Sequence, residues 1–331
     1  MNAATRLPET GLRPLGECVV LVTPRSFGLH EVGLRSELET HVAEVRYRPG
    51  PLPAGELAAL LGDVDGLLAG LDELSAAVFE RAPRLRVVAR YGVGVDRVDL
   101  EAAARHGVTV TLTPGANANA VAELTVALLF ALARPLAAGR ERVRAGEWPA
   151  LPGLELGGRT LGLIGLGRIG SLVAGKARAL GLRVLAHDPF VPESALAELV
   201  GLDTLARESD FLSLHAPLTE ETRNIVGERL LESVKPGAAL VNTARGELVD
   251  EEALVRALDD GRLRAAALDV LAEEPPLPGH PLLARDDVLV TPHMGPHTAE
   301  AMAAMGRMAL DELIAVLDGR PPRFPARKEL P

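Results

Sequence analysis

Three polar side chains in the second half of the sequence could together transfer a proton and bind an anion. Arg245, Glu274 and His293 each come soon after a short apolar run that is typical of a buried strand. An imidazole can give or take a proton, a carboxylate beside it favours its protonated form, and a guanidinium can bind a carboxylate and polarise a carbonyl. Open α/β sheets bind ligands at the carboxyl ends of their strands, so the three groups could act on one small 2-hydroxy or 2-keto acid.

Simpler interpretations exist for each of these groups. The arginine could cap a helix or lie on the surface, and the glutamate, like its neighbour Glu273, could be a solvated loop carboxylate. His280 and His297 compete with His293 for the role of proton carrier. His280 lies in a loop rich in Pro and Gly, and His297 lies beyond the strand end, so we expect His293 to carry the proton.

A glycine-rich turn predicts a dinucleotide site. Gly165, Gly167 and Gly170 follow the apolar run Leu161–Ile164 and precede a helical pattern. They would permit a tight turn, admit a pyrophosphate close to the backbone and let the helix pack on the strand, while helix N–H groups hold the phosphates. Asp188 ends the next predicted strand, about 20 residues further on, where it would accept the ribose hydroxyls of adenosine. It would repel a 2′-phosphate and no arginine follows it, so we expect the cofactor to be NAD.

These groups need a scaffold, and the apolar pattern predicts two units of alternating strands and helices. We expect an α/β protein with two doubly wound, Rossmann-like domains built on parallel sheets. Residues 117–138 are predicted to form one helix with Pro135 near its end, and Ala299–Leu317 forms a helix that the pattern alone does not assign to a domain. The other helices are expected at residues 29–40, 54–61, 75–81 and 169–180, and the strands at 18–23, 41–47, 66–69, 85–90, 161–164, 183–187, 211–214, 239–242, 265–269 and 288–291.

Composition and charge exclude several function classes. The length of 331 residues favours two domains, and the net charge of −10 argues against a protein that binds nucleic acid. The sole cysteine, Cys18, lies in an apolar run and is expected to be a core thiol. The histidines lack metal-ligand spacing, so no metal site is expected. No segment suggests a membrane span or a signal peptide, so we expect a cytoplasmic protein.

Taken together, the motifs resemble the D-isomer-specific 2-hydroxyacid dehydrogenase family over nearly the whole chain. The resemblance includes three further stretches, at residues 91–96, 117–123 and 215–219. Within the family, the chain looks most like short bacterial members related to phosphoglycerate dehydrogenase. The resemblance implies hydride transfer between NAD(H) and a small 2-hydroxy or 2-keto acid, with an active-site cleft between the two domains.

The resemblance also implies roles for individual residues. It implies that His293 is the acid/base, that Glu274 keeps it protonated for keto-acid reduction, and that Arg245 binds the substrate carboxylate and carbonyl. Backbone at Val93 and Gly94 would hold the substrate carboxylate. The implied cofactor contacts, with Asp269 facing the nicotinamide carboxamide, are Gly165, Gly167, Arg168, Ile169, Gly170, Asp188, Ala216, Thr243, Ala244, Arg245, Asp269, His293 and Gly295.

The same resemblance implies a discontinuous domain organisation and an oligomer. The substrate domain would comprise residues 1–113 and 297–331, and the NAD-binding domain residues 114–296. Two copies would form a homodimer, or a dimer of dimers, mainly through the cofactor domain.

The substrate stays open at this stage. The best-known phosphoglycerate dehydrogenases carry an Arg-Ser pair where this chain has residues 69–72, and Asp72 has the wrong charge for a phosphate. Arg25 or Arg90 could take over that role. The candidates are therefore 3-phosphoglycerate with phosphohydroxypyruvate, and glyoxylate or hydroxypyruvate. A formate or phosphonate dehydrogenase and a non-catalytic, NAD-sensing corepressor-like protein share the scaffold, although the lack of long disordered tails argues against the corepressor.

Overall fold

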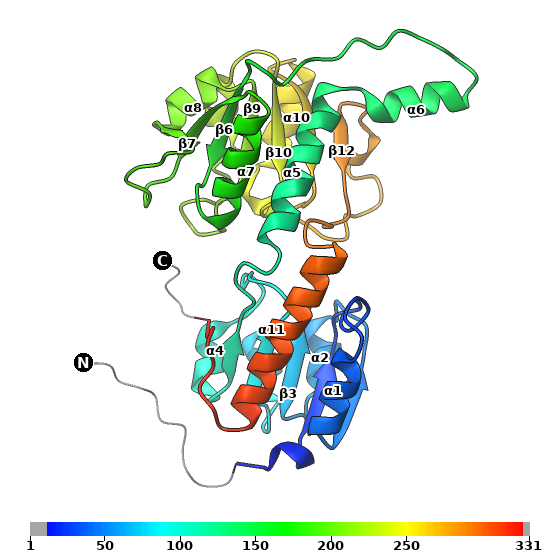
Figure 1. The fold of residues 1–331 in the computed structure, drawn as a ribbon, viewed down its shortest axis with the longest axis vertical. Helices are drawn as coiled ribbons and strands as arrows, with labels where there is room; N and C mark the ends of the chain where they lie inside the picture. The colour runs from blue at the N-terminus through cyan, green and yellow to red at the C-terminus, as the bar shows by residue number, and fades with distance from the viewer. Residues whose placement is uncertain (1–11, 327–331) are drawn as a thin grey trace. The chain divides into compact units, whose positions relative to one another are not determined.

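The computed structural model describes residues 12–326, and the chain divides into two α/β units. The first unit comprises Met1–Asn117 and Thr298–Pro331, and the second comprises Ala118–His297. The boundaries expected from the sequence, after residues 113 and 296, differ from these by a few residues. Each unit is a parallel sheet with helices on both faces (Figure 1), so the predicted fold class is confirmed.

The first unit is built on a five-stranded sheet in the order β2-β1-β3-β4-β5, with every neighbouring pair parallel. Its elements are η1 (Leu15–Glu17), β1 (Val19–Val22), α1 (Leu34–His41), β2 (Glu44–Tyr47), α2 (Ala54–Leu60), β3 (Gly66–Ala69), α3 (Ala76–Glu80), β4 (Val87–Arg90), α4 (Leu100–Arg105), β5 (Thr109–Thr111) and, from the other end of the chain, α11 (Ala299–Leu317).

Both faces of this sheet are buried, which explains why its central strands are continuous apolar runs. In β1, Leu21 belongs to a core cluster with residues of α2 and α3, whereas Val20 belongs to a cluster with residues of α1 and α11. Cys18 is fully buried in the second cluster, as predicted. Packing therefore assigns α11 to the first unit, because its apolar side covers β3 and β4.

The second unit is built on a seven-stranded parallel sheet in the order β12-β11-β10-β9-β6-β7-β8. Its elements are α5 (Ala118–Ala133), α6 (Leu136–Arg144), β6 (Thr160–Ile164), α7 (Arg168–Ala179), β7 (Arg183–His187), β8 (Glu198–Leu199), α8 (Leu202–Glu208), β9 (Phe211–Leu214), α9 (Glu228–Ser233), β10 (Ala238–Asn242), η2 (Gly246–Leu248), α10 (Glu251–Asp259), β11 (Leu263–Leu268), η3 (Pro281–Ala284) and β12 (Val288–Val290). The strand order reverses between β6 and β9, which is where doubly wound sheets bind dinucleotides.

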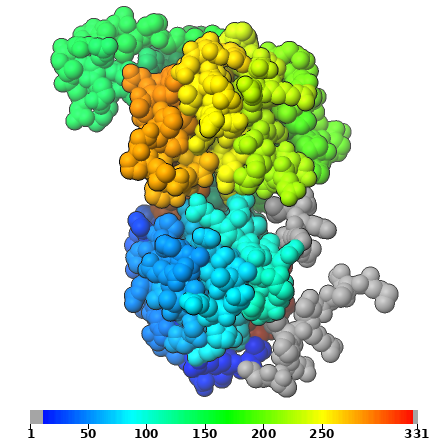
Figure 2. Space-filling view, turned by 180° about the vertical axis from the view of Figure 1, so that it is seen from behind, coloured from blue at the N-terminus to red at the C-terminus, as the bar shows by residue number. Residues whose placement is uncertain are grey.

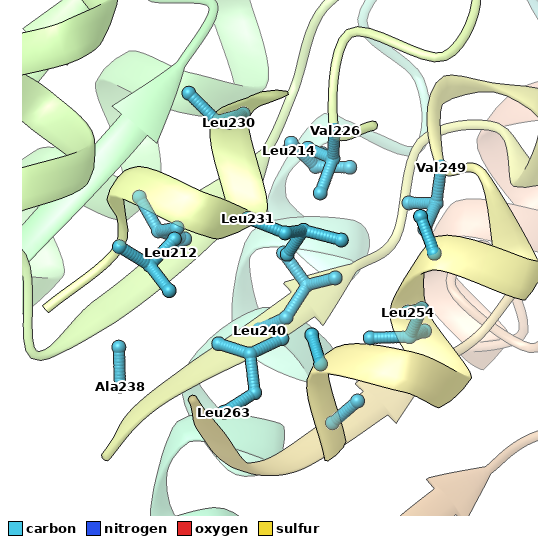
Figure 3. Packing of buried hydrophobic residues seen from close by; sticks show 14 of the residues in the cluster. Leu212, Leu214, Val226, Leu230, Leu231, Ala238, Leu240, Val249, Leu254 and Leu263 are labelled. Carbon is cyan, nitrogen blue, oxygen red and sulfur yellow. The ribbon is translucent and has the colours of Figure 1, made fainter. Parts of the chain in front are cut away.

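Leucine-rich packing holds the helices of this unit to its sheet. Figure 3 shows Leu212 of β9 and Leu240 of β10 in one cluster with Leu231 of α9 and Leu254 of α10. A separate cluster joins the other face to α5 and α7. Burial of each such side chain contributes roughly 1.5–3 kcal/mol, so the strand ends that carry polar groups start from rigid positions.

The prediction of one helix over residues 117–138 is wrong in one respect, because the structure has two helices there. α5 ends at Ala133 and α6 begins at Leu136, with a bend of 61° between them. Pro135 explains the break, since proline lacks an N–H and disfavours helical backbone in the residue before it. The helix expected from residue 29 also starts later, at Leu34, after Gly33 with a left-handed φ of 101°.

By length and hydropathy, no single helix among residues 12–326 could cross a membrane. α5 and α6 satisfy that test only as a bent pair, and one face of α5 is buried in the protein core.

Candidate active site

The glycine turn joins β6 to α7. Gly165 has a φ of 95°, which favours glycine, and a Cβ there would lie 2.6 Å from the His215 carbonyl carbon and 2.7 Å from the Ala216 nitrogen. Gly170 faces the turn just as closely, because its Cβ would lie 2.3 Å from the Gly165 oxygen. Packing within the protein therefore requires glycine at these two positions.

Gly167 has open space in front of it. In the described part of the chain no atom lies within 4 Å of a Cβ built there, and Gly167 and Arg168 are both exposed. α7 begins at Arg168, with Ile169 in its first turn, and the N–H groups of a first turn have no partner within their helix. The space and these donors fit a pyrophosphate, in agreement with the motif.

Asp188 follows β7, and two backbone amides hold its carboxylate. Oδ2 accepts a hydrogen bond from the Leu166 N–H at 2.8 Å, and Oδ1 accepts one from the Phe190 N–H at 2.9 Å. Each oxygen keeps a further lone pair. A carboxylate fixed beside the glycine turn can therefore accept ribose hydroxyls, and this contact stays a prediction.

His215 supports the glycine turn, a role that the sequence analysis misses because it assigns a function only to the adjacent Ala216. The His215 Nε2 lies 2.9 Å from the Ser213 Oγ, and its Cβ lies 3.5 Å from where a Cβ of Gly170 would be. Burial lowers the pKa of His215 to about 3, so its ring is neutral at pH 7. A neutral ring can pack under the turn without placing a positive charge in the core.

The histidine and glutamate that were predicted to act together are in contact. The His293 Nδ1 lies 2.8 Å from the Glu274 Oε2, and 24% and 21% of the two side chains are exposed. The second oxygen of Glu274 accepts a hydrogen bond from the Leu271 N–H at 3.1 Å. Because the carboxylate occupies Nδ1, Nε2 is the ring nitrogen through which His293 can exchange a proton with a substrate.

Asp269 holds the backbone turn that carries His293. Its buried carboxylate accepts hydrogen bonds from the Thr291 hydroxyl at 2.6 Å and from the Met294 and Gly295 N–H groups at 2.8 Å each. His293 has a φ of 50°, a left-handed conformation that is uncommon for a residue with a Cβ, and its N–H donates to the Asp269 carbonyl at 2.9 Å. Asp269 therefore positions His293, and its contact with the nicotinamide carboxamide stays a prediction.

Asn242 and Gly246, to which the sequence analysis gives no role, position Arg245. The buried Asn242 side chain donates to the Arg245 carbonyl at 2.7 Å and accepts from the Ala244 N–H at 3.0 Å. A Cβ on Gly246 would lie 2.0 Å from the Leu271 carbonyl carbon. The segment that carries Arg245 therefore packs directly against the loop that carries Glu274.

Thr243 connects the same segment to α5. Its hydroxyl lies 2.9 Å from the Thr125 hydroxyl, which donates to the Val121 carbonyl at 2.9 Å. Thr243 is buried and Ala244, like Ala216, is half-buried. Their contacts with the nucleotide stay predictions.

Three predicted groups follow three neighbouring strands, since β10, β11 and β12 lie side by side and precede Arg245, Glu274 and His293 in that order. The competing histidines are placed differently. The His280 Nε2 lies 3.1 Å from the Glu251 Oε2. Burial lowers the pKa of the His297 imidazole, and the neighbouring His293 lowers it further. The His297 side chain makes no hydrogen bond within residues 12–326.

Val93 and Gly94, the predicted substrate loop, follow β4 in the first unit. Arg90 is 4% exposed and donates from Nε to the Gly94 carbonyl at 3.1 Å and from Nη1 to the Gly70 carbonyl. Asp72 is fully buried, and its carboxylate accepts hydrogen bonds from two backbone amides at 2.8 and 3.0 Å. The interpretation of Arg90 as a phosphate-binding cation is therefore wrong, and so is that of Asp72 as an anion that repels a phosphate. Both side chains instead hold loops of the protein. The contact of Val93 and Gly94 with a substrate stays a prediction.

Within residues 12–326, no group of three or more His, Cys, Asp or Glu side chains is arranged to hold a metal ion.

Comparison with known proteins extends these observations. The family model described as the NAD binding domain of D-isomer specific 2-hydroxyacid dehydrogenase matches residues 126–295. The chain is 43% identical to a hydroxypyruvate reductase of Thermotoga maritima, over 80% of this chain and 89% of that protein, and 42% identical to a glyoxylate reductase of Aeropyrum pernix, over 90% and 94%. It is also 42% identical to a D-3-phosphoglycerate dehydrogenase of Methanocaldococcus jannaschii, over 88% of this chain, and spans 56% of the length of that relative.

A solved structure of a protein from Thermus thermophilus has a TM-score of 0.86 and 44% identity with this chain, and the match covers 93% of this chain and 100% of that one. Fold, glycine turn and sequence matches together define a family of NAD-dependent oxidoreductases that act on CH–OH groups. This chain belongs to the D-isomer specific 2-hydroxyacid dehydrogenase family, and its cofactor is NAD.

Proposed function

We propose that this protein reduces a short, unphosphorylated 2-keto acid, such as glyoxylate or hydroxypyruvate, with NADH, and oxidises the matching D-2-hydroxy acid in the reverse direction. The observation that carries the proposal is the 2.8 Å contact between His293 and Glu274. Glu274 and His293 follow β11 and β12, and the adjacent strand β10 leads to Arg245.

Each residue has one task in this reaction. NAD, when bound at the glycine turn, supplies or accepts the hydride. His293 gives a proton to the keto oxygen during reduction and takes it back during oxidation. Glu274 binds Nδ1 of His293 and fixes the orientation of the ring. Arg245 binds the substrate carboxylate through its planar guanidinium and polarises the keto group.

The first unit supports an unphosphorylated substrate. A phosphate requires cationic side chains that point toward it, whereas the buried Arg90 binds loop carbonyls. Leu71 and Val93, at the carboxyl ends of β3 and β4, are 41% and 36% exposed. An apolar surface next to the predicted carboxylate-binding loop suits a short substrate without a second anion.

Phosphohydroxypyruvate is the second candidate substrate, because an arginine at the same edge of the sheet is available to bind its phosphate. Arg25 is exposed after β1, and its Nε donates to the Gly50 carbonyl at 2.8 Å, while its other nitrogens make no hydrogen bond within the described residues. If Arg25 binds a phosphate, Arg25→Ala will raise the KM for phosphohydroxypyruvate about tenfold and leave the KM for glyoxylate unchanged.

The experiment that tests the proposal follows NADH oxidation by absorbance with glyoxylate, hydroxypyruvate, phosphohydroxypyruvate and pyruvate. We expect one of the first two to have the highest kcat/KM. His293→Ala and Arg245→Ala should each lower kcat/KM by about 100-fold or more. His41→Ala, at an exposed histidine of α1 in the first unit, is the control and should behave like the wild type.

Two results would contradict the proposal. One is full activity of the His293→Ala protein. The other is a protein that binds NADH yet reduces none of the keto acids, and in that case an NAD-sensing role would replace the catalytic one.

We also propose a homodimer that forms through the second unit. Leu136 and Val143 of α6 are 65% and 51% exposed, and Trp148 in the loop after α6 is 89% exposed. Figure 2 shows α6 and this loop projecting from the rest of the second unit. Exposed apolar side chains of this size are typical of a protein interface, and a second copy of the chain is the partner that the family resemblance implies.

A further inference from the structure

A second hydrogen-bonded pair connects α10 to the loop that carries Glu274. The His280 Nε2 lies 3.1 Å from the Glu251 Oε2, and the other oxygen of Glu251 accepts a hydrogen bond from the Ala272 N–H at 2.9 Å. One carboxylate therefore holds the loop of residues 272–280 at both of its ends.

The pair is largely shielded from water. Only 14% of the His280 side chain and 22% of the Glu251 side chain are exposed. The His280 Nδ1 is buried and has no hydrogen-bond partner within residues 12–326. A buried N–H without an acceptor is costly, so this geometry assigns the ring proton to Nε2. The Nε2–H then donates a hydrogen bond to Glu251. The direction of the hydrogen bond is thus set by the surroundings of the ring.

The pair lies between the two segments that carry catalytic side chains. Glu251 begins α10, directly after the segment that carries Arg245. Ala272 follows Leu271, whose N–H donates to Glu274 at 3.1 Å and whose carbonyl packs against Gly246. A displacement at Ala272 would therefore move the group that holds the catalytic carboxylate.

We propose that Glu251 and His280 are positioning residues, which keep Glu274 within hydrogen-bond distance of His293. Their effect passes through the 272–280 loop, so they differ from the catalytic groups. This inference rests on the proposed function for the role that it gives to Glu274.

The main test compares Glu251→Ala with Glu252→Ala. Glu252 is the matched control, since its side chain lies in the same helical turn, is 92% exposed and, within residues 12–326, pairs only with Arg256, at 4.0 Å. We expect Glu251→Ala to lower kcat for keto-acid reduction by about tenfold, with the KM for NADH unchanged.

Variants of His280 give a second test that stands even if Glu251→Ala does not fold. The glutamine amide in His280→Gln can donate where Nε2 does, so this variant should keep most of the wild-type kcat. His280→Ala cannot donate there, and it should reproduce the loss of kcat seen in Glu251→Ala. The double alanine variant should lose no more than either single variant, because both act on one loop.

A spectroscopic readout separates this inference from the proposed function. The NMR signal of the His293 ring, identified by its disappearance in His293→Asn, should shift in Glu251→Ala and remain in place in Glu252→Ala. If the wild type reduces no keto acid, the proposed function fails, while the NMR comparison still decides the inference. An unmoved His293 signal, or a Glu251→Ala protein with the kcat of Glu252→Ala, would show that the pair is only structural and overturn the inference.

Discussion

Gly246 and Leu271 approach each other so closely that no side chain fits between them. A Cβ on Gly246 would lie 2.0 Å from the carbonyl carbon and 2.2 Å from the carbonyl oxygen of Leu271. The contact joins the segment of Arg245 to the loop of Glu274. The spacing between the segments of Arg245 and Glu274 therefore depends on a glycine.

Gly246→Ala should damage both activity and stability. The obstacle is backbone, which cannot rotate away as a side chain can, so the loop must shift and Glu274 will move from His293. We expect the free energy of unfolding to fall by about 1–3 kcal/mol, measured by urea denaturation, and kcat/KM to fall with it. Gly175→Ala in α7 is the control, since no atom of the described chain lies within 4 Å of its Cβ. Activity and stability like those of the wild type in Gly246→Ala would contradict this prediction.

Replacing Asp188 should change the preference between NADH and NADPH. Asp188→Ser removes the charge that repels a 2′-phosphate and the acceptors of the ribose hydroxyls. We expect NADH to bind about tenfold more weakly, a loss of about 1.4 kcal/mol, and the ratio of NADPH to NADH affinity to rise, as measured by fluorescence titration. Asp188→Asn keeps one oxygen for the backbone amides, so it separates the charge from the geometry. The prediction fails if the ratio does not change in either variant.

His215 should make stability decline in mild acid. Burial lowers its pKa from 6.5 to about 3, so between these values the unfolded chain binds a proton that the folded chain does not. The contribution of His215 to the free energy of unfolding is complete above pH 6.5 and is lost as the pH falls toward 3. We expect a loss of about 1–2 kcal/mol between about pH 7 and about pH 5, measured by denaturant unfolding. His215→Gln should lack this part of the pH dependence, and an identical dependence in the two proteins would refute the assignment.

The exposed tryptophan provides a test of the proposed homodimer. Trp148→Glu places a charge in the apolar surface formed with α6, so we expect a dimeric wild type and a monomeric variant in analytical ultracentrifugation. Phe190→Glu, at a side chain that is 86% exposed elsewhere on the second unit, is the control and should remain dimeric. A monomeric wild type, or a dimeric Trp148→Glu protein, would rule out this interface.

Local patterns in the sequence were sufficient for the scaffold, and they also provided the candidate catalytic groups. The central strands of both sheets appear as apolar runs because both of their faces are buried, and the glycines at 165 and 170 lie against the same turn or against residues that follow the neighbouring strand β9. Pro135 is also a local signal, but the prediction of one helix over residues 117–138 did not include the break that this proline causes. The pairing of His293 with Glu274 could be expected only because their strands were predicted to end at one edge of a sheet.

The tertiary structure decided the roles of side chains whose partners lie far away in the chain. The charge of Asp72 appeared to exclude a phosphate, yet its carboxylate is buried and accepts hydrogen bonds from backbone amides of the first unit. His280 appeared to be a loop histidine, yet it pairs with Glu251, which lies 29 residues away in the chain. No spacing rule connects such residues, because their contact depends on how whole elements pack. The sequence by itself determined the chemistry that the side chains can perform, and packing determined which of them hold the others in place.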